Sequence, residues 1–113
     1  MLQNGQVRGS NLHRAAHRPQ MRRRSADAVI TDTPDVGLAV LVADCVPLVL
    51  YDPAAHVVAA VHAGWRGTVA GVTQAAVEAM ADLGADPATI VVGIGPAILA
   101  DRYQVGKDVV DAA

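Results

Sequence analysis

The sequence predicts an α/β, or α+β, layered domain built on a mixed sheet with at least one packed amphipathic helix. Short Val-rich runs have the length of strands, and one longer stretch repeats its apolar residues at spacings of three and four. Gly- and Pro-containing turns separate these segments. With 113 residues, of which 52% are hydrophobic, the chain can bury a core but holds no more than one domain.

Five segments are expected to form strands. The run over 36–43 is almost entirely apolar, which is typical of a strand buried on both faces. Pro47 cannot donate to a ladder, so an interruption is expected there before the next strand. The predicted strands cover residues 29–31, 36–43, 48–51, 56–62 and 90–94.

One helix is predicted over 68–83, after a glycine-flanked loop at 63–67. Thr68 is placed to serve as its N-cap, and Gly84 stands where a helix-ending glycine belongs. The segment 106–113 begins a further helix-like pattern. The apolar positions that share one face of the main helix are Val69, Val72, Ala76, Val77, Met80 and Leu83.

Residues 1–25 are interpreted as a poorly ordered, Arg-rich leader. They contain six arginines and no acidic residue, whereas the remainder contains three basic and eleven acidic residues. Nucleic-acid binding is not favoured, because the leader has no aromatic side chains to stack on bases and no helical period. A secretory signal is not indicated either, since no apolar segment follows the arginines.

Two further features suggest a cytoplasmic protein. No apolar run reaches the roughly 18–20 residues that a membrane span requires. The single cysteine, Cys45, cannot form an intramolecular disulfide, which fits a reducing compartment.

Cys45 and His62 are the candidate reactive residues, each placed at the end of a predicted strand. If those strands are neighbours, the thiolate and the imidazole can bind zinc, or the imidazole can activate the thiol as a nucleophile. A buried small thiol and a hydrogen-bonded core histidine would explain the same residues without function. Gly93 and Gly95 lie at another predicted strand end, where the backbone can approach a ligand closely.

Four sequence strings resemble the YfiH-type family, whose members are called multicopper polyphenol oxidases (laccase domain) or purine nucleoside phosphorylases. The strings are Ala-Asp-Cys-Val-Pro at 43–47, His-Ala-Gly-Trp-Arg-Gly at 62–67, Gly-Ile-Gly-Pro-Ala-Ile at 93–98 and Tyr-Gln-Val-Gly at 103–106. The resemblance implies a layered sandwich like that of cytotoxic-necrotising-factor-type hydrolases. It also implies that residues 26–113 form the central part of an otherwise incomplete domain.

The resemblance further implies a zinc ion held by one cysteine and two histidines, with Cys45 and His62 as two of the three ligands. The family's first histidine falls at Arg8, and a guanidinium cannot bind a cation. His13 or His17 would have to substitute, although their spacing does not indicate it. Leu99 and Gln104 also depart from the family pattern.

The implied activity is phosphorolysis of adenosine, inosine or methylthioadenosine, or deamination of adenosine, with a purine nucleoside and phosphate as ligands. Arg66, Gly93 and Gly95 are candidates for the anion site; for Arg66 an ion pair with an acid such as Asp44 is the alternative. Three other functions remain open. They are a Cys–His hydrolase, a copper-linked polyphenol oxidase, and a fragment of such an enzyme that is either inactive or dependent on a second chain for the missing parts.

Overall fold

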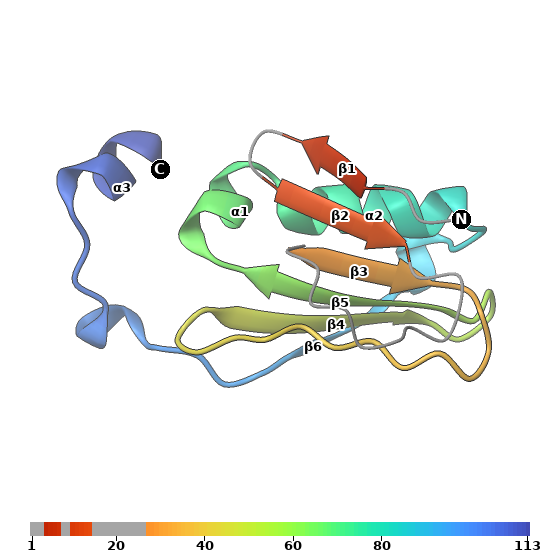
Figure 1. Ribbon diagram of the computed structural model, residues 1–113. Coiled ribbons are helices and arrows are strands. Elements are labelled where there is room, and N and C mark those ends of the chain that lie inside the picture. The colour runs from red at the N-terminus through yellow and green to blue at the C-terminus, as the bar shows by residue number, and fades with distance from the viewer. Residues whose placement is uncertain (1–3, 8–9, 15–26) are drawn as a thin grey trace.

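The computed structural model describes residues 4–7, 10–14 and 27–113, and it confirms a mixed α/β domain (Figure 1). Six strands form one sheet in the order β1-β2-β3-β5-β4-β6. The β2–β3 pair is parallel and the other pairs are antiparallel. The strands are β1 (Asn4–Val7), β2 (Ser10–Arg14), β3 (Ala28–Thr31), β4 (Val46–Asp52), β5 (Val57–Ala63) and β6 (Val91–Ile94).

The helices are short apart from one. The longest is α2 (Val72–Asp82), and α1 (Trp65–Val69) precedes it after a break. At the C-terminal end α3 lies apart from the sheet (Figure 1). The remaining helical segments are η1 (Pro87–Thr89), η2 (Ala100–Arg102) and α3 (Lys107–Ala112).

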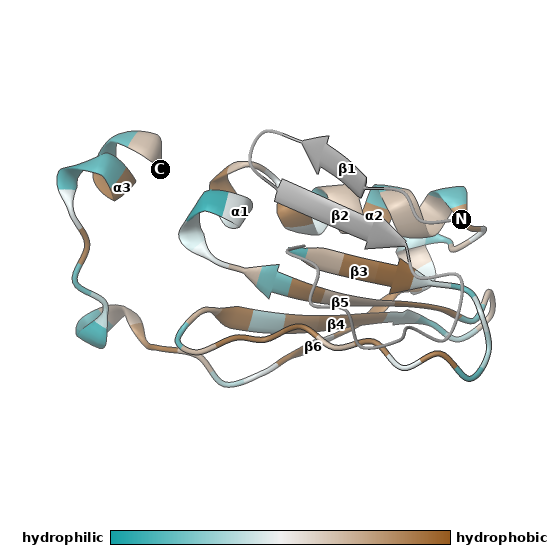
Figure 2. Ribbon diagram, viewed as in Figure 1, coloured by the Kyte–Doolittle hydropathy of each residue, from teal (hydrophilic) through white to brown (hydrophobic). Residues whose placement is uncertain are grey.

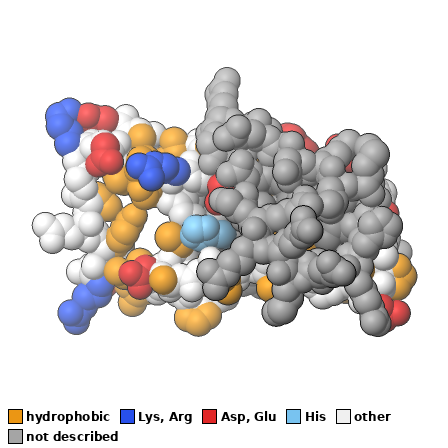
Figure 3. Space-filling view, viewed as in Figure 1, with side chains coloured by type: hydrophobic (Ala, Val, Ile, Leu, Met, Phe, Trp, Pro, Cys, Tyr) orange, Lys and Arg blue, Asp and Glu red, His pale blue; other side chains and the backbone are white. Residues whose placement is uncertain are grey.

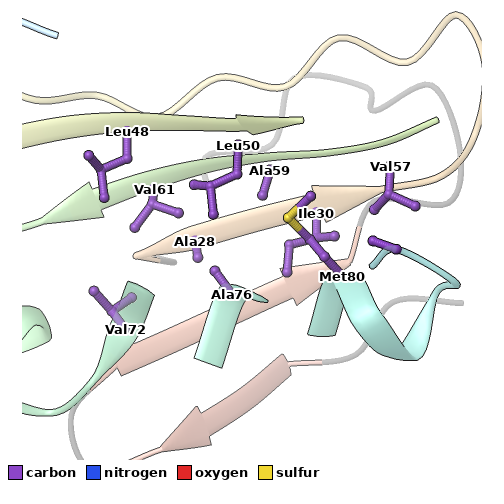
Figure 4. Packing of buried hydrophobic residues seen from close by; sticks show 11 residues of the cluster. Ala28, Ile30, Leu48, Leu50, Val57, Ala59, Val61, Val72, Ala76 and Met80 are labelled. Atoms are coloured by element: carbon purple, nitrogen blue, oxygen red, sulfur yellow. The ribbon is translucent and has the colours of Figure 1, made fainter. Parts of the chain in front are cut away.

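The hairpin β4–β5 forms the middle of the sheet, and α2 covers one of its faces. Side chains from the strands and from α2 point toward one another in this core (Figure 4). Hydrophobic residues run along β3, β4 and β5 (Figure 2). The fully buried members of the core are small or aliphatic, as the composition requires: Ala28, Ile30, Leu50, Val57, Ala59, Val61, Val72, Ala76 and Met80.

Asp52, the last residue of β4, is a buried carboxylate that joins three segments. It accepts hydrogen bonds from the backbone N–H groups of Ala54 and Asp86, at 2.9 and 2.8 Å, and from the Thr89 hydroxyl at 3.3 Å. The Asp86 N–H is the main cause that holds the pKa of Asp52 below its usual value, against burial, which raises it. Asp52 thereby fastens η1 to the end of the hairpin opposite Cys45.

The opposite face of the sheet, here called the open face, is less covered. Alternate residues of β4 point to the two faces, so Leu48 and Leu50 are buried under α2 while Val49 and Tyr51 point to the open face and are exposed. In β5, Val57, Ala59 and Val61 point to the covered face. The single helical layer therefore leaves the other apolar face without a comparable cover among the described residues.

The predicted helix over 68–83 is divided in two. Gly71 adopts a left-handed conformation with φ of 83°, which ends α1 and provides the start of α2. Thr68 lies inside α1 and is not an N-cap, and part of the predicted loop at 63–67 is helical. The C-terminal end was predicted correctly, because Gly84 follows α2 with φ of 101°.

The buried strand predicted over 36–43 is wrong. No described strand pairs with this segment, and its odd-numbered residues are exposed, with Leu41 at 83%. An apolar run can predict a strand, but a strand exists only where a neighbour completes its ladder. The strands predicted around 29–31, 48–51, 56–62 and 90–94 are confirmed, with ends that agree within two residues. The interruption expected at Pro47 is wrong, because β4 includes Pro47, whose carbonyl accepts a hydrogen bond from Gly95 N.

No pattern in the sequence indicated β1 and β2, which fall inside the predicted leader. They correct the expectation of irregular structure for residues 4–7 and 10–14. The other leader residues, Arg8 and His17 among them, lie outside the described residues. A separate leader over 1–25 therefore stays a prediction.

Candidate metal centre

Strand register brings Cys45 and His62 to the same end of the sheet. In the β4–β5 ladder Pro47 is paired with His62, and Cys45 precedes Pro47 by two residues. His62 points to the open face, and Cys45 lies in a bend just before β4, at the same end of the sheet. Cys45 was expected at the end of a strand; it precedes the start of β4, and antiparallel pairing sets that start beside the end of β5.

Gly64 shows how closely the two side chains converge. A Cβ placed on Gly64 would lie 3.4 Å from Cys45 Sγ and 3.6 Å from His62 Nε2. The two atoms are therefore separated by no more than the sum of these distances. Glycine at this position keeps the space between the sulfur and the imidazole free of a side chain.

Asp27 approaches the other nitrogen of the same imidazole. Its Oδ1 lies 3.7 Å from His62 Nδ1, which is longer than a hydrogen bond but within ion-pair range. The backbone supports this approach, since His62 N donates to Asp27 O at 2.7 Å. Asp27 is therefore the carboxylate beside the His62 imidazole. Nothing in the sequence spacing indicates Asp27, because its position depends on the register of β3 against β5.

The imidazole is partly exposed, so a ligand or ion can reach it. The His62 side chain is 31% accessible and that of Asp27 is 27%. Figure 3 shows a histidine at the surface beside hydrophobic side chains. Cys45, a free thiol, is also half-buried. The site is thus a partly exposed surface at this end of the sheet that combines polar and apolar side chains.

A third metal ligand is not found in the part of the chain that the structure describes. No group of three His, Cys, Asp or Glu residues there could hold a metal ion. Arg8 and His17 lie outside the described residues, and His13 lies in β2 opposite Val29, with no description of its side chain. Register places the start of β2 at the same end of the sheet as His62, because Leu12, Ala28 and Val61 are aligned.

Gly95 serves close packing. A Cβ at Gly95 would meet Pro47 Cγ at 2.6 Å, and Gly95 N donates to Pro47 O at 2.9 Å. A second backbone bond, from Ile98 N to Asp44 O at 2.9 Å, holds this segment against the strand entry that carries Cys45. Gly93 is different, since a Cβ there would meet nothing closer than 3.9 Å.

Arg66 is exposed near the start of α1. Its guanidinium lies 4.7 Å from the centre of the Trp65 ring, a cation–π contact. No ion pair joins it to Asp44 or to another carboxylate among the described residues. Its N–H groups therefore have no acidic partner among the described residues and can bind an anion. Arg66 also lies only four residues after His62 in the sequence.

The helices of the described segments are all too short or too polar to cross a membrane.

Comparison with known proteins gives the family. The sequence matches the family described as "Multi-copper polyphenol oxidoreductase laccase" over residues 1–113. It is 52% identical over 83 residues to a protein of Deinococcus radiodurans named purine nucleoside phosphorylase, covering 74% of this chain and 33% of that protein. A Streptomyces coelicolor protein of the same name is 56% identical over 82 residues, covering 73% and 34%.

Solved structures agree with these relatives. The crystal structure of a Bacillus licheniformis hypothetical protein YfiH matches with a TM-score of 0.72 and 41% identity, covering 77% of this chain and 33% of that one. The YlmD structure from Geobacillus stearothermophilus matches with a TM-score of 0.71 and 41% identity, covering 76% and 32%. The chain spans about a third of the length of these relatives, and it belongs to the YfiH-type family of laccase-domain proteins.

Proposed function

We propose that this chain provides a thiolate–imidazole zinc site to an enzyme that processes purine nucleosides. The observation that supports the proposal is the convergence of Cys45 Sγ and His62 Nε2 on the space above Gly64. A thiolate and an imidazole are donors that zinc accepts readily, at about 2.3 and 2.0–2.1 Å. Copper also accepts these donors, so the identity of the metal is part of the test.

Two features fit a metal ion: the ligand atoms of Cys45 and His62, and the Asp27 carboxylate beside the His62 imidazole. Asp27 beside His62 Nδ1 favours a proton on that nitrogen, which leaves the Nε2 lone pair available on the side of Cys45. Zinc bound there would supply Lewis acidity. The two donors leave room for a third ligand from outside the described residues and for substrate.

The substrate class comes from the relatives. Those of Deinococcus radiodurans and Streptomyces coelicolor are named purine nucleoside phosphorylases, and a prokaryotic relative 45% identical over 86 residues is named adenosine deaminase RL5. Phosphorolysis requires a phosphate beside the ribose, and the exposed guanidinium of Arg66 can bind two of its oxygens. Gly93, where a Cβ would meet nothing closer than 3.9 Å, remains a candidate for backbone contact with this anion.

Metal analysis of the purified chain tests the site. We expect close to one equivalent of zinc, and loss of most of it in Cys45→Ser and in His62→Ala. His56→Ala is the matched control, since His56 lies in the β4–β5 turn at the far end of the hairpin and should retain zinc. Chains that hold no metal, or variants that hold as much as the parent, would refute the zinc site.

Product analysis with adenosine and phosphate tests the reaction. Adenine would demonstrate phosphorolysis, and inosine would demonstrate deamination. Absence of both products from a zinc-loaded chain would refute independent activity and favour a fragment that needs a further polypeptide. Copper in place of zinc, with oxidation of a phenol, would favour the polyphenol oxidase function instead.

A Cys–His hydrolase is the second candidate, because Asp27, His62 and Cys45 are arranged as an orienting acid, a base and a nucleophile. In that function no metal is required. Activity that survives a chelator but is lost on alkylation of Cys45 would favour the hydrolase. Activity lost to the chelator and restored by zinc would exclude it. Either reaction requires a reduced thiol, for which the cytoplasm is the proposed location.

A further inference from the structure

Strand β6 closes the sheet at one side, yet its residues are those of an interior strand. Val91, Val92, Gly93 and Ile94 are all exposed, Ile94 at 73%. Strands that consist of consecutive apolar residues are normally covered on both faces. Exposed edge strands normally carry charged residues or proline, and β6 carries neither.

The backbone of β6 also presents groups that no described strand pairs with. Gly95 N bonds to Pro47 O, and hydrogen-bonded pairs alternate along an antiparallel ladder, so Gly93 with Val49 and Val91 with Tyr51 are the next bonded pairs. The N–H and C=O groups of Val92 and Ile94 therefore point away from β4. These groups are placed to accept another strand.

Both faces of β6 extend apolar surfaces of the sheet. Val92 and Ile94 are paired with Leu50 and Leu48, which α2 buries, but the cover stops before β6. On the open face Val91 lies beside Tyr51, and both are exposed. The apolar surface thus continues outward past the last strand on each side.

The solved relatives indicate what occupies this surface. The Bacillus licheniformis protein contains this fold within a third of its chain, so two thirds of its polypeptide lie beyond the matched part. We propose that β6 is an interior strand of the completed sheet. Polypeptide that corresponds to the unmatched part of the relatives adds a strand along Val92 and Ile94 and covers both faces of β6.

The test is complementation by a separate polypeptide. The probe consists of the Streptomyces coelicolor relative's residues outside its 82-residue match. We expect a 1:1 complex with the purified chain by sedimentation, and slowed hydrogen exchange at the amides of Val92 and Ile94. If the chain alone is insoluble, co-expression with and without the probe replaces mixing, and recovery of a soluble 1:1 complex is the expected result.

Two variants of β6 distinguish strand pairing from nonspecific hydrophobic association. Ile94→Lys places a charge in the new interface, and Val92→Pro removes an outward N–H without breaking a bond to β4. Each should weaken the complex at least about tenfold. Gln74→Lys, on the exposed side of α2, adds the same charge and should change affinity less than about twofold.

Two results would overturn the proposal. One is a folded chain, verified by circular dichroism, that does not bind the probe. The other is a dimer of this chain in which Val92 and Ile94 are protected and the probe is excluded. Binding is the readout, so failure of the zinc or nucleoside experiments would leave this result intact, and the reverse holds as well.

Discussion

The covered face and the open face of the sheet carry different properties of the molecule. On the covered face, Leu50, Val57 and Met80 are fully buried and hold α2 against the strands. On the open face, Val49 and Tyr51 remain exposed, and His62 lies at the end of this face with Cys45 close to it. The comparison shows that the residues which stabilise this chain are separate from those proposed to give it a function.

Truncation of neighbouring β4 residues should show the largest difference between the two faces. Leu50→Ala empties a fully buried position and should cost about 3 kcal/mol of unfolding free energy. Val49→Ala, one residue away and 54% exposed, should cost less than about 0.5 kcal/mol. Urea unfolding measures both. Similar losses for the two variants would show that the open face is covered in solution.

Asp52 is a polar member of the covered face, and its effect should depend on pH. Its pKa is lower in the folded chain than its ordinary 3.8, so the ionised carboxylate stabilises the fold above that pH, and the contribution is lost as the pH falls below it. Asp52→Asn should therefore lose more stability relative to the parent at pH 7 than at pH 3. Urea unfolding at both values measures the difference.

The control for this prediction is Asp82→Asn, which removes an exposed carboxylate at the end of α2. Its loss of stability should be small at both pH values. An Asp52 variant with the same deficit at pH 3 as at pH 7 would mean that the charge contributes nothing.

The two glycines near the site should respond differently to alanine. Gly95→Ala forces a Cβ against the Pro47 ring and should cost about 1–3 kcal/mol while displacing the segment that carries Cys45. Gly93→Ala places its Cβ at an ordinary contact distance of 3.9 Å from Val49 O and should leave stability nearly unchanged. Thermal unfolding gives both values. If Gly93→Ala weakens phosphate binding without loss of stability, a ligand role for Gly93 is supported.

Asp27→Asn should have a selective effect on the site. Removal of the carboxylate beside His62 Nδ1 should lower zinc affinity about 10–100-fold, as for other carboxylates that orient a histidine ligand. Competition with a chromophoric chelator measures the affinity. Asp44→Asn is the comparison, and an equal loss there would indicate general electrostatics instead of orientation of His62.

Local patterns in the sequence were sufficient for much of this fold. Alternating and β-branched residues predicted the hairpin strands and β6, and the spacing from Val72 to Met80 predicted the buried side of α2. The break at Gly71 was missed because a glycine inside an apolar period does not reveal its φ value. The strand predicted over 36–43 failed because pairing depends on a neighbour that an apolar pattern cannot identify.

The candidate site, like the fold, was predictable where local patterns determine it and not where it depends on contacts between distant segments. Cys45 and His62 were singled out by their residue types and by the strings around them, and their convergence was expected if their strands were neighbours. Asp27 could not be predicted, because it reaches His62 only through the register of β3 against β5. Arg66 was predicted as a site residue, whereas its stacking on Trp65 is a detail of the short helix α1.

The position of both donors on one hairpin has a consequence for assembly. Cys45 and His62 are the outer ends of a loop that closes when β4 folds back on β5, and no distant segment is needed to bring them together. Short-range contacts of this kind form early and at little entropic cost. A metal that recognises the pair can therefore lock the central hairpin while the rest of the polypeptide is still being organised around it.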